Sequence, residues 1–335
     1  MHIAIIGAGL AGLTSARQLQ QLGHSVVLYE KSGGPGGRMS TRQTDLGGFD
    51  HGAQYFTVSS DGFHKHTSAW RKAGWIDTWN GRLASLDAGV AKPAGRSQQR
   101  LVAVPGMRAL AGHLSEGVEV RVGHLVRRIE RDGNRWLLSV QHDSVPIPAT
   151  AGPFDAVIVA MPADQAAALL EPAPAFAKQA ASVHMAPCWT LMLGFQEALP
   201  LNYDAAWVAN SRLGWICRDS SKPGRRPGEN WVCHATAPWS IEHLEDEPER
   251  AREKLLKAFH EATGSQVQPM FVAVHRWRYA QALAPLPDDC LWDADLKLGL
   301  CGDWFAAGLE GSGRVENAVM SAQALVMRMK DSAGL

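Results

Sequence analysis

The chain has 335 residues, of which 46% are hydrophobic and 20% charged, as in a folded globular protein of about two domains and unlike a disordered chain. The 33 Lys and Arg residues balance 33 Asp and Glu residues, which excludes nucleic-acid or anionic-membrane binding driven by bulk charge. The apolar runs are too short to span a bilayer, so we expect no nucleic-acid and no membrane partner.

The cysteines and histidines form no pattern of a disulfide framework or a metal site. The 5 cysteines are scattered without a C-x-x-C pair, and the 13 histidines form no H-x-x-x-H or H-E-x-x-H pattern. We therefore expect reduced thiols in a cytoplasmic protein that has no metal centre. No motif indicates an oligomeric state.

Residues 2–30 follow the order of a dinucleotide-binding unit. Apolar runs predict buried strands over residues 2–6 and 25–29, and a helical pattern over residues 13–22 lies between them. The turn before the helix is glycine-rich and reads Gly7, Ala8, Gly9, Leu10, Ala11, Gly12. This G-x-G-x-x-G motif follows a strand, opens a helix and precedes an acid at the end of the second strand, so it predicts dinucleotide binding.

Four residues of this unit have distinct predicted tasks. Gly7 makes the tight turn, Gly9 lets a pyrophosphate approach the backbone, and Gly12 lets helix and strand pack closely. Glu30 is expected to accept hydrogen bonds from the adenosine ribose, while the helix N-terminus offers N–H groups to the phosphates. The motif alone does not choose between FAD and NAD.

A second glycine-rich stretch, K-S-G-G-P-G-G-R over residues 31–38, follows where an NAD-binding domain would start another helix. Its G-G-R segment resembles the second motif of the FAD-dependent amine oxidase superfamily. In that superfamily the arginine lies against the flavin pyrophosphate, and the glycines let the backbone lie beside the cofactor. The resemblance favours FAD and implies cofactor contacts for Lys31, Gly37 and Arg38, the alternative being a flexible surface loop.

The following residues narrow the resemblance. G-G-R-M-S-T over residues 36–41 and F-D-H-G-A-Q-Y-F-T over residues 49–57 resemble the renalase family, a branch of the flavin amine oxidase superfamily. The resemblance covers nearly the whole chain, and the bacterial renalase-like NAD/FAD-dependent oxidoreductases are the most similar members.

The resemblance implies a two-domain α/β fold. A Rossmann-like FAD-binding domain of the glutathione-reductase/p-hydroxybenzoate-hydroxylase type carries an inserted substrate domain built on an antiparallel sheet. We expect the FAD-binding domain over residues 1–56, 101–164 and 271–335, and the substrate domain over residues 57–100 and 165–270.

Two further segments resemble cofactor-binding parts of the superfamily. Alternating strands from residue 118 to 141 resemble its three-stranded meander, which would place Val126 near the adenine, although plain core packing explains this valine equally well. A last buried strand over residues 298–301 leads into Asp303, which by resemblance binds the ribityl hydroxyls. The alternative for Asp303 is a helix-capping or loop aspartate. The final helix, from Val315, would point its N-terminus at the flavin N1–C2=O edge.

The sequence contains no Ser-His-Asp arrangement, no paired catalytic carboxylates and no metal cluster, as expected of a hydride-transferring flavoenzyme. Classical amine oxidases of the superfamily have a lysine near flavin N5, but the corresponding strand over residues 189–195 has none. No cysteine lies in the superfamily's covalent-flavin context, so we expect non-covalent FAD. The missing lysine puts amine oxidation in doubt.

The renalase resemblance implies a different substrate. Family members oxidise the misreduced 1,2- and 1,6-dihydro isomers of NAD(P)H, pass the hydride to FAD and then to O2, and release NAD(P)+ and hydrogen peroxide. The small-molecule partners would thus be a dinucleotide and O2.

Matching motif to motif implies the residues of the substrate pocket. Gln54 and Tyr55 fall at the substrate face of the flavin, His234 and Thr236 on a pocket strand, and Trp277 opposite Tyr55. Tyr55 and Trp277 would hold the nicotinamide ring flat against the flavin, and His234 would bind the carboxamide. Core packing remains an alternative for each of these residues.

Two other functions remain open, namely a flavin-dependent amine oxidase and a non-catalytic FAD-binding protein. The basic cluster of Lys222, Arg225 and Arg226 is expected to lie on a solvated loop, with attraction of substrate phosphates as the alternative.

Overall fold

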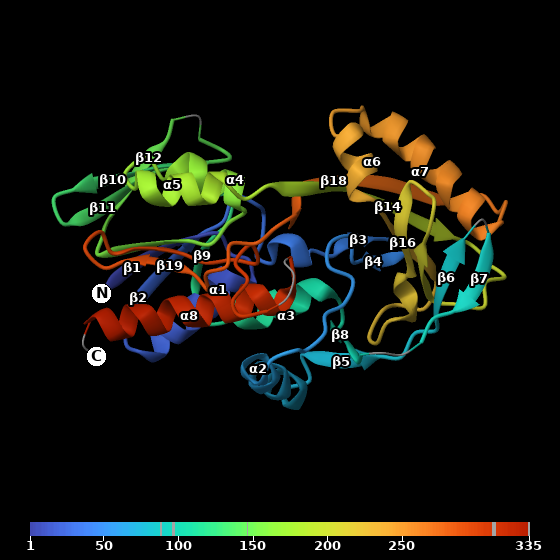
Figure 1. Ribbon diagram of the computed structural model, residues 1–335, viewed down its shortest axis with the longest axis horizontal. Helices are drawn as coiled ribbons and strands as arrows, with labels where there is room; N and C mark the ends of the chain where they lie inside the picture. The colour runs from blue at the N-terminus through green and yellow to red at the C-terminus, as the bar shows by residue number, and fades with distance from the viewer. Residues whose placement is uncertain (88, 96–97, 146, 310–312, 334–335) are drawn as a thin grey trace.

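The computed structural model describes residues 1–87, 89–95, 98–145, 147–309 and 313–333, which form two lobes (Figure 1). The first lobe is built on a six-stranded sheet of order β19-β20-β13-β1-β2-β9. In that order its strands are Leu291–Asp293, Leu298–Leu300, Ala156–Val159, His2–Ile6, Ser25–Tyr29 and Glu119–Arg121. All neighbours pair in parallel except β19 with β20.

Both faces of this sheet are covered, because successive residues of a strand point to opposite faces. Ile3 and Ile5 of β1 pack in one core with the helices α1, α3 and α8, whereas Ala4 and Ile6 pack in another core with the three-stranded sheet β10-β11-β12. The bounds of these elements are α1 Leu10–Gln21, α3 Met107–Ser115, α8 Val315–Ala333, β10 His124–Asp132, β11 Arg135–His142 and β12 Ala149–Phe154. This layered sheet confirms the predicted Rossmann-like α/β fold.

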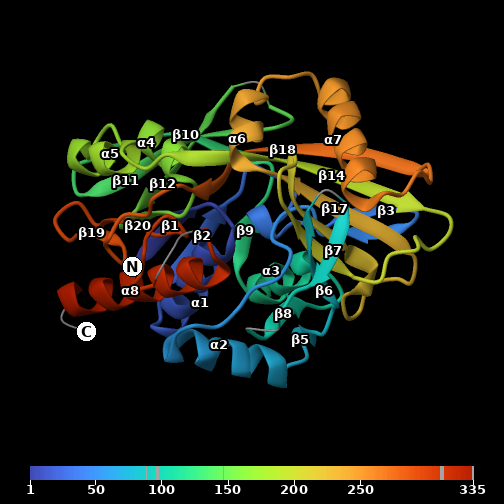
Figure 2. The ribbon, with the colours of Figure 1, turned by 45° about the vertical axis from the view of Figure 1, so that its right-hand side comes forward.

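The second lobe is built on a seven-stranded sheet of order β18-β14-β17-β16-β15-β6-β7. In that order the strands are Phe271–Ala282, Met185–Phe195, Glu229–Ala235, Leu213–Arg218, Ala205–Val208, Leu83–Asp87 and Val90–Pro93. Only the β15–β6 pair is parallel. Helices α6 (Ala237–Glu242) and α7 (Pro248–Thr263) lie on one face of the sheet (Figure 2), where Leu255 and Phe259 pack against Leu191.

The lobes do not divide where the sequence pattern predicted. Strand β18 pairs with β14 along its length, so the second lobe continues to Ala282 rather than ending at residue 270. Helices α4 (Ala163–Leu169) and α5 (Pro174–Ala181) pack on the meander core of the first lobe. Helix α2 (Asp61–Lys72) packs on α8. Sheet pairing and core contacts decide to which lobe each of these elements belongs. The sequence shows only where the alternation of strands and helices breaks off, and this does not identify the lobe.

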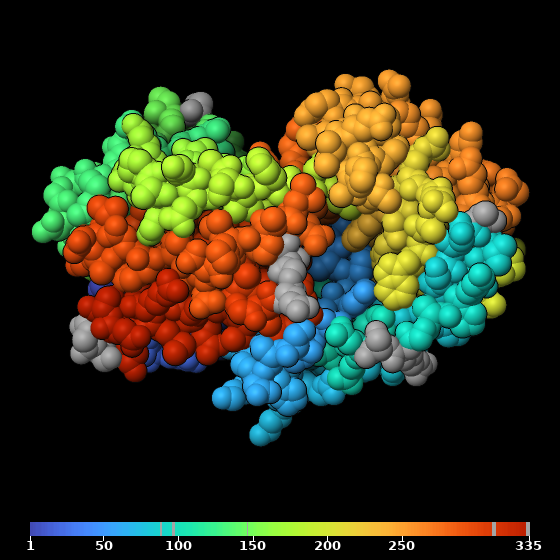
Figure 3. All heavy atoms as spheres, in the orientation of Figure 1, coloured from blue at the N-terminus to red at the C-terminus, as the bar shows by residue number. Residues whose placement is uncertain are grey.

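The remaining short elements lie outside the two large sheets and the three-stranded sheet. They are η1 (Gly37–Met39), β3 (Arg42–Thr44), β4 (Gly47–Phe49), β5 (Ile76–Trp79), β8 (Arg100–Ala103) and η2 (Asp219–Ser221). Figure 3 shows the molecular surface hollowed between the lobes, with blue N-terminal residues deep in the hollow. None of the described helices combines the length and apolar character needed to cross a bilayer.

Candidate functional site

The glycine-rich turn after β1 has one position that is closed by packing and one that is open. A Cβ atom on Gly12 would lie 2.0 Å from the carbonyl oxygen of Gly7, whereas nothing lies within 4 Å of a Cβ on Gly9. Helix α1 begins at Leu10, directly after Gly9, which forms no side-chain cap. The helix therefore starts three residues before the predicted Leu13, because the last three residues of the glycine motif, from Leu10 to Gly12, form the first turn of α1. The open face of Gly9 beside this N-terminus fits a phosphate group.

Glu30 anchors the turn from the end of β2. Its buried carboxylate accepts hydrogen bonds from Ala8 N at 2.9 Å and from Ser32 N at 2.8 Å. Each carboxylate oxygen has more than one acceptor site, so this anchoring leaves capacity to accept a ribose hydroxyl.

The second glycine-rich stretch packs on the first. Gly36 N donates to Ala8 O at 2.9 Å, and a Cβ on Gly37 would lie 3.7 Å from the Cα of Gly9. Gly36 and Gly37 have φ values of +124° and +53°, which favour glycine. Lys31, at the start of the stretch, is exposed. The contacts at Gly36 and Gly37 show that this part of the stretch is not a detached surface loop.

Arg38, presented by η1, contacts three other segments of the chain, one of which is the end of β18 in the second lobe. Its guanidinium binds both carboxylate oxygens of Asp303, which follows β20, and donates to Ala280 O at 3.0 Å at the end of β18. Its backbone oxygen accepts from Ala53 N at 2.9 Å. The predicted cofactor residues Arg38 and Asp303 thus lie together at the carboxyl edge of the sheet, where α/β folds bind their ligands.

The two valines of the predicted cofactor site lie in different surroundings. Val126 is buried in the core beneath the meander together with Tyr29. Val315 begins α8, and the next residue, Glu316, accepts hydrogen bonds from Ser59 N and Ser60 N.

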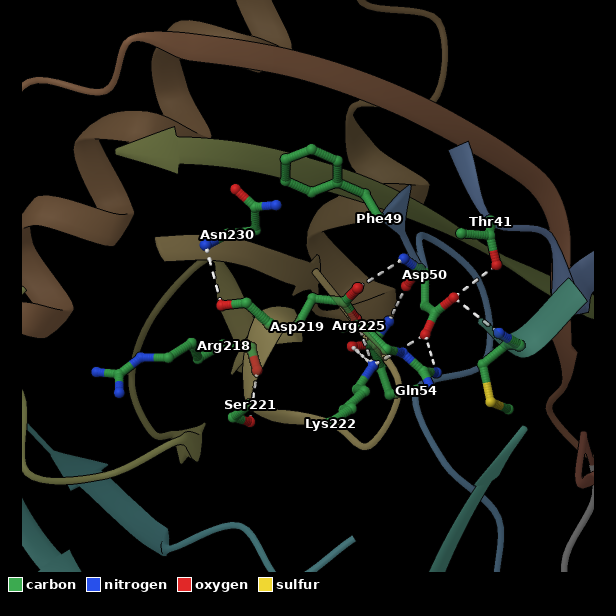
Figure 4. Close-up of polar contacts among 12 residues, drawn as sticks. Thr41, Phe49, Asp50, Gln54, Arg218, Asp219, Ser221, Lys222, Arg225 and Asn230 are labelled. Atoms are coloured by element: carbon green, nitrogen blue, oxygen red, sulfur yellow. Dashed lines mark hydrogen bonds and ion pairs between the residues drawn. The ribbon is translucent and has the colours of Figure 1, made fainter. Parts of the chain in front are cut away.

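A buried ion cluster, consisting of Asp50, Asp219, Lys222 and Arg225, lies where the lobes meet (Figure 4). Lys222 Nζ lies 2.5 Å from Asp219 Oδ1 and 3.6 Å from Asp50 Oδ2, and Arg225 Nη2 lies 2.5 Å from Asp50 Oδ2. The four side chains are at most 3% exposed. The expectation of a solvated basic loop is therefore wrong for Lys222 and Arg225, while Arg226 is exposed.

Mutual pairing favours the charged forms of Asp50 and Lys222, whereas burial and the nearby charge of Asp50 raise the pKa of Asp219. Burial alone would raise the pKa of Asp50, but Lys222, Arg225 and hydrogen bonds including that from Thr41 hold it below its ordinary value. Burial alone would lower the pKa of Lys222, but Asp219, Cys217 and Asp50 raise it. Lys222 therefore keeps its proton at neutral pH.

Gln54 connects the ion cluster to the predicted substrate face. Its Oε1 accepts from Lys222 Nζ at 3.3 Å, and its Nε2 donates to Asp50 O and Gly52 O. Both donor hydrogens of the amide thus have partners in its own loop, which fixes the backbone leading into Tyr55.

The aromatic residues predicted to flank the substrate have separate partners. The Tyr55 ring lies 5.7 Å from Trp215 and 6.1 Å from Trp79. The Trp277 ring stacks on His51 at 5.2 Å, and its Nε1 donates to His51 O at 2.9 Å. A joint grip of Tyr55 and Trp277 on one substrate ring stays a prediction.

His234 and Thr236 lie at the end of β17. Burial lowers the pKa of His234 to about 4, and its Nε2 has no hydrogen-bond partner in the part of the chain that the structure describes. Across the strands His234 pairs with Thr190 and Trp215. Thr236 caps α6 by accepting a hydrogen bond from Trp239 N at 3.4 Å.

The structure adds site residues that the sequence analysis did not assign. His275 lies 4.3 Å from Trp277 and 4.8 Å from His51, ring to ring, and burial lowers the pKa of each of these two histidines to about 4. The H-R-W segment of β18 offered a signal for His275, since it carries Trp277. No local pattern marks Arg100, which lies over the Tyr55 ring.

Comparisons with known proteins agree with this geometry. A family model described as NAD(P)-binding Rossmann-like domain matches residues 5–72, and one described as flavin containing amine oxidoreductase matches residues 87–329. Among curated proteins, 4,4'-diaponeurosporene oxygenase from Staphylococcus aureus is 40% identical over 57 residues. That match spans only 17% of this chain and 12% of the relative.

Solved structures share the whole fold at low identity. A protoporphyrinogen oxidase-like protein from Exiguobacterium sp. 255-15 superposes with a TM-score of 0.77 at 15% identity, covering 100% of this chain and 99% of that one. Cyclohexylamine oxidase from Brevibacterium oxydans superposes with a TM-score of 0.73 at 14% identity, covering 100% and 99%. A putrescine oxidase variant gives 0.72 at 13% identity, covering 98% of each chain.

Proposed function

Because the chain belongs to the flavin containing amine oxidoreductase family and its cofactor is non-covalently bound FAD, we propose that it oxidises misreduced dihydronicotinamide dinucleotides. The substrates are the 1,2- and 1,6-dihydro isomers of NAD(P)H. When bound, FAD would supply the acceptor for the substrate hydride, and O2 would be the final acceptor of the two electrons. With one proton from solvent, the products are NAD(P)+ and hydrogen peroxide.

The open turn at Gly9, the Glu30 carboxylate and the Arg38–Asp303 pair fit the cofactor. Gly9 leaves room for a phosphate at the N-terminus of α1, and Glu30 keeps acceptor capacity for a ribose. Arg38 holds a guanidinium at the same edge of the sheet. In this proposal these residues bind and orient the cofactor, and none of them has to transfer a proton.

The single observation that carries the choice of substrate is the uncharged His234 beside an aromatic wall. Its pKa of about 4 leaves the imidazole neutral at neutral pH, and Nε2 has no partner among the described residues. Trp215, its cross-strand neighbour, contacts Tyr55. A neutral imidazole can hydrogen-bond a carboxamide, and the aromatic rings suit a flat ring. A dihydronicotinamide needs no base to release hydride.

Amine oxidation is the second candidate, favoured by the contact between Lys222 and Gln54 at the predicted substrate face. A protonated amine must first lose a proton before it can be oxidised. The raised pKa of Lys222 and the low pKa values of His51, His234 and His275 make these groups poor acceptors of that proton. The residues therefore favour the dihydronicotinamide.

An anaerobic reductive titration separates the candidates. Purified holoprotein is mixed with each dihydronicotinamide isomer, with ordinary 1,4-NADH as a control, and with cyclohexylamine and putrescine, while the oxidised-flavin absorbance is followed. We expect fast bleaching by a misreduced isomer, and readmitted oxygen should restore the band with one equivalent of hydrogen peroxide. Bleaching by an amine alone would establish the second candidate, and bleaching by none would leave a non-catalytic FAD protein.

A further inference from the structure

Arg100 is a buried cation next to the predicted substrate face. It begins β8, where it pairs with Trp79 of β5, and it is 8% exposed. Its guanidinium carbon lies 5.3 Å from the centre of the Tyr55 ring and 5.6 Å from that of Trp207. Both contacts are to apolar ring faces, which attract a cation but do not neutralise its charge.

No Asp or Glu of the described chain lies within ion-pair distance of Arg100. Its Nη1 donates to Gln98 O at 3.4 Å, and its Nε has no hydrogen-bond partner in the described part of the chain. The other buried cations near the lobe junction differ, since Lys222 and Arg225 both contact carboxylates. An arginine keeps its proton in proteins, so Arg100 is a buried charge that lacks a counter-ion among the described residues.

A cavity adjoins this charge. It has a volume of about 280 Å³ and is lined by residues 78–81 and 98–100. The side chains of Asn80, Gln98 and Gln99 on its wall are amides, which hydrogen-bond polar ligand groups without adding charge. Space for an anionic group is therefore present beside the unpaired guanidinium.

We propose that Arg100 binds the phosphate attached to the nicotinamide ribose of the substrate. This inference rests on the proposed function and deepens it, because it makes the substrate a nucleotide and not merely a dihydropyridine. The planar guanidinium can donate two parallel hydrogen bonds to phosphate oxygens. The phosphate in turn supplies the missing counter-ion.

Charge balance during the reaction gives a second reason for a phosphate here. Loss of hydride turns the neutral dihydropyridine ring into a pyridinium cation. An unneutralised Arg100 next to Tyr55 would repel this positive charge and oppose the oxidation. A phosphate bound to Arg100 cancels the guanidinium charge, so the site accommodates the cationic product.

The test crosses two substrates with two proteins. The two substrates are dihydronicotinamide mononucleotide and the corresponding riboside, which lacks the phosphate, both as the same misreduced isomer. The two proteins are the wild type and Arg100→Gln. We expect the variant to lose about 10- to 100-fold in kcat/KM for the mononucleotide and less than about 3-fold for the riboside. An equal loss for both substrates would overturn the proposal.

Control variants separate charge from shape. Arg100→Lys keeps the charge but not the paired donors, and should recover part of the mononucleotide activity. Arg252→Gln removes an exposed arginine of α7 and should change the activity toward neither substrate. If Arg100→Gln and Arg100→Lys have the same kcat/KM for the mononucleotide, the charge at this position has no role.

A binding measurement does not depend on turnover. Inorganic pyrophosphate should bind the oxidised wild-type holoprotein in calorimetry, compete with the mononucleotide, and bind Arg100→Gln at least about 10-fold more weakly. If no dihydronicotinamide bleaches the flavin but pyrophosphate binding still depends on Arg100, the proposed function fails while the anion site stands. Equal pyrophosphate affinity in both proteins, or non-competitive inhibition, would refute the substrate-phosphate site.

Discussion

Arg38 and Asp303, which are 265 residues apart in the chain, form a two-pronged ion pair with Nη2–Oδ1 at 2.5 Å and Nη1–Oδ2 at 2.7 Å. The pair joins the loop after β2 to the turn after β20. Both segments follow the carboxyl ends of strands in one sheet. The pair therefore connects two parts of the predicted FAD site, and each residue fixes the orientation of the other.

The first prediction concerns Asp303. In Asp303→Asn, the guanidinium of Arg38 loses its charged partner, and we expect the FAD dissociation constant to rise about 10- to 100-fold. Flavin fluorescence released during dilution of the holoprotein measures this change. Asp132→Asn, at an exposed position of β10, is the matched control and should release no extra flavin. Unchanged retention in Asp303→Asn would contradict a role of the pair in FAD binding.

The second prediction compares two glycines of the same turn. A methyl group on Gly12 meets the Gly7 carbonyl oxygen at 2.0 Å, so Gly12→Ala should lower the free energy of unfolding by about 1–3 kcal/mol. A methyl group on Gly9 meets nothing within 4 Å, so Gly9→Ala should leave the apoprotein as stable as the wild type while weakening FAD binding.

Urea unfolding of the apoproteins, followed by FAD titration, checks both halves of this comparison. If Gly9→Ala binds FAD normally, the space at Gly9 is not the phosphate site. If Gly12→Ala has the same urea midpoint of unfolding as the wild type, α1 does not pack as closely against the turn as the structure shows.

The parts of the site that the sequence predicted are those encoded by neighbouring residues. Gly7 to Gly12 and Glu30 lie within one strand–helix–strand unit, so local pattern was sufficient to place them together. Asp303 was assigned by resemblance to the flavin amine oxidase superfamily, with the buried strand before it as support. Its pairing with Arg38 was not predicted, since it depends on two strands meeting in one sheet.

Other features depend on contacts that no local pattern encodes. Arg225 pairs with Asp50, which is 175 residues away in the chain. The burial of this arginine depends on that pairing, which only the folded structure shows. Likewise β18 belongs to the second sheet because β14 pairs with it. A period-2 pattern identifies a strand but not its partner.

The third prediction concerns pH. Burial lowers the pKa of His234 from 6.5 to about 4 in the folded protein. As the pH falls through this window, the unfolded chain takes up a proton that the folded chain does not, so stability is lost. Above the window both states are neutral, and the histidine causes no pH dependence.

His234→Gln therefore should lose less stability than the wild type between pH 6.5 and about 4. Urea unfolding at a series of pH values measures the difference, which should be absent at neutral pH apart from a constant offset. His64→Gln, at an exposed position of α2, should follow the wild-type curve. Parallel curves for His234→Gln and the wild type would mean that His234 is not buried in its neutral form.

The fourth prediction concerns the buried ion cluster. Lys222→Met leaves Asp50 and Asp219 buried with Arg225 as the remaining cation of the cluster, so we expect a loss of about 3–5 kcal/mol in the free energy of unfolding. Lys178→Met, at an exposed position of α5, should change this free energy by less than about 0.5 kcal/mol.

A double variant distinguishes charge from packing in that cluster. Lys222→Met combined with Asp219→Asn removes one charge of each sign and leaves the contact between Arg225 and Asp50. If the cost of Lys222→Met arises from the unpaired carboxylate, the double variant should be more stable than Lys222→Met alone. If the two losses add, the ion pair between Lys222 and Asp219 contributes nothing, and the destabilisation comes from the lost side-chain packing of Lys222.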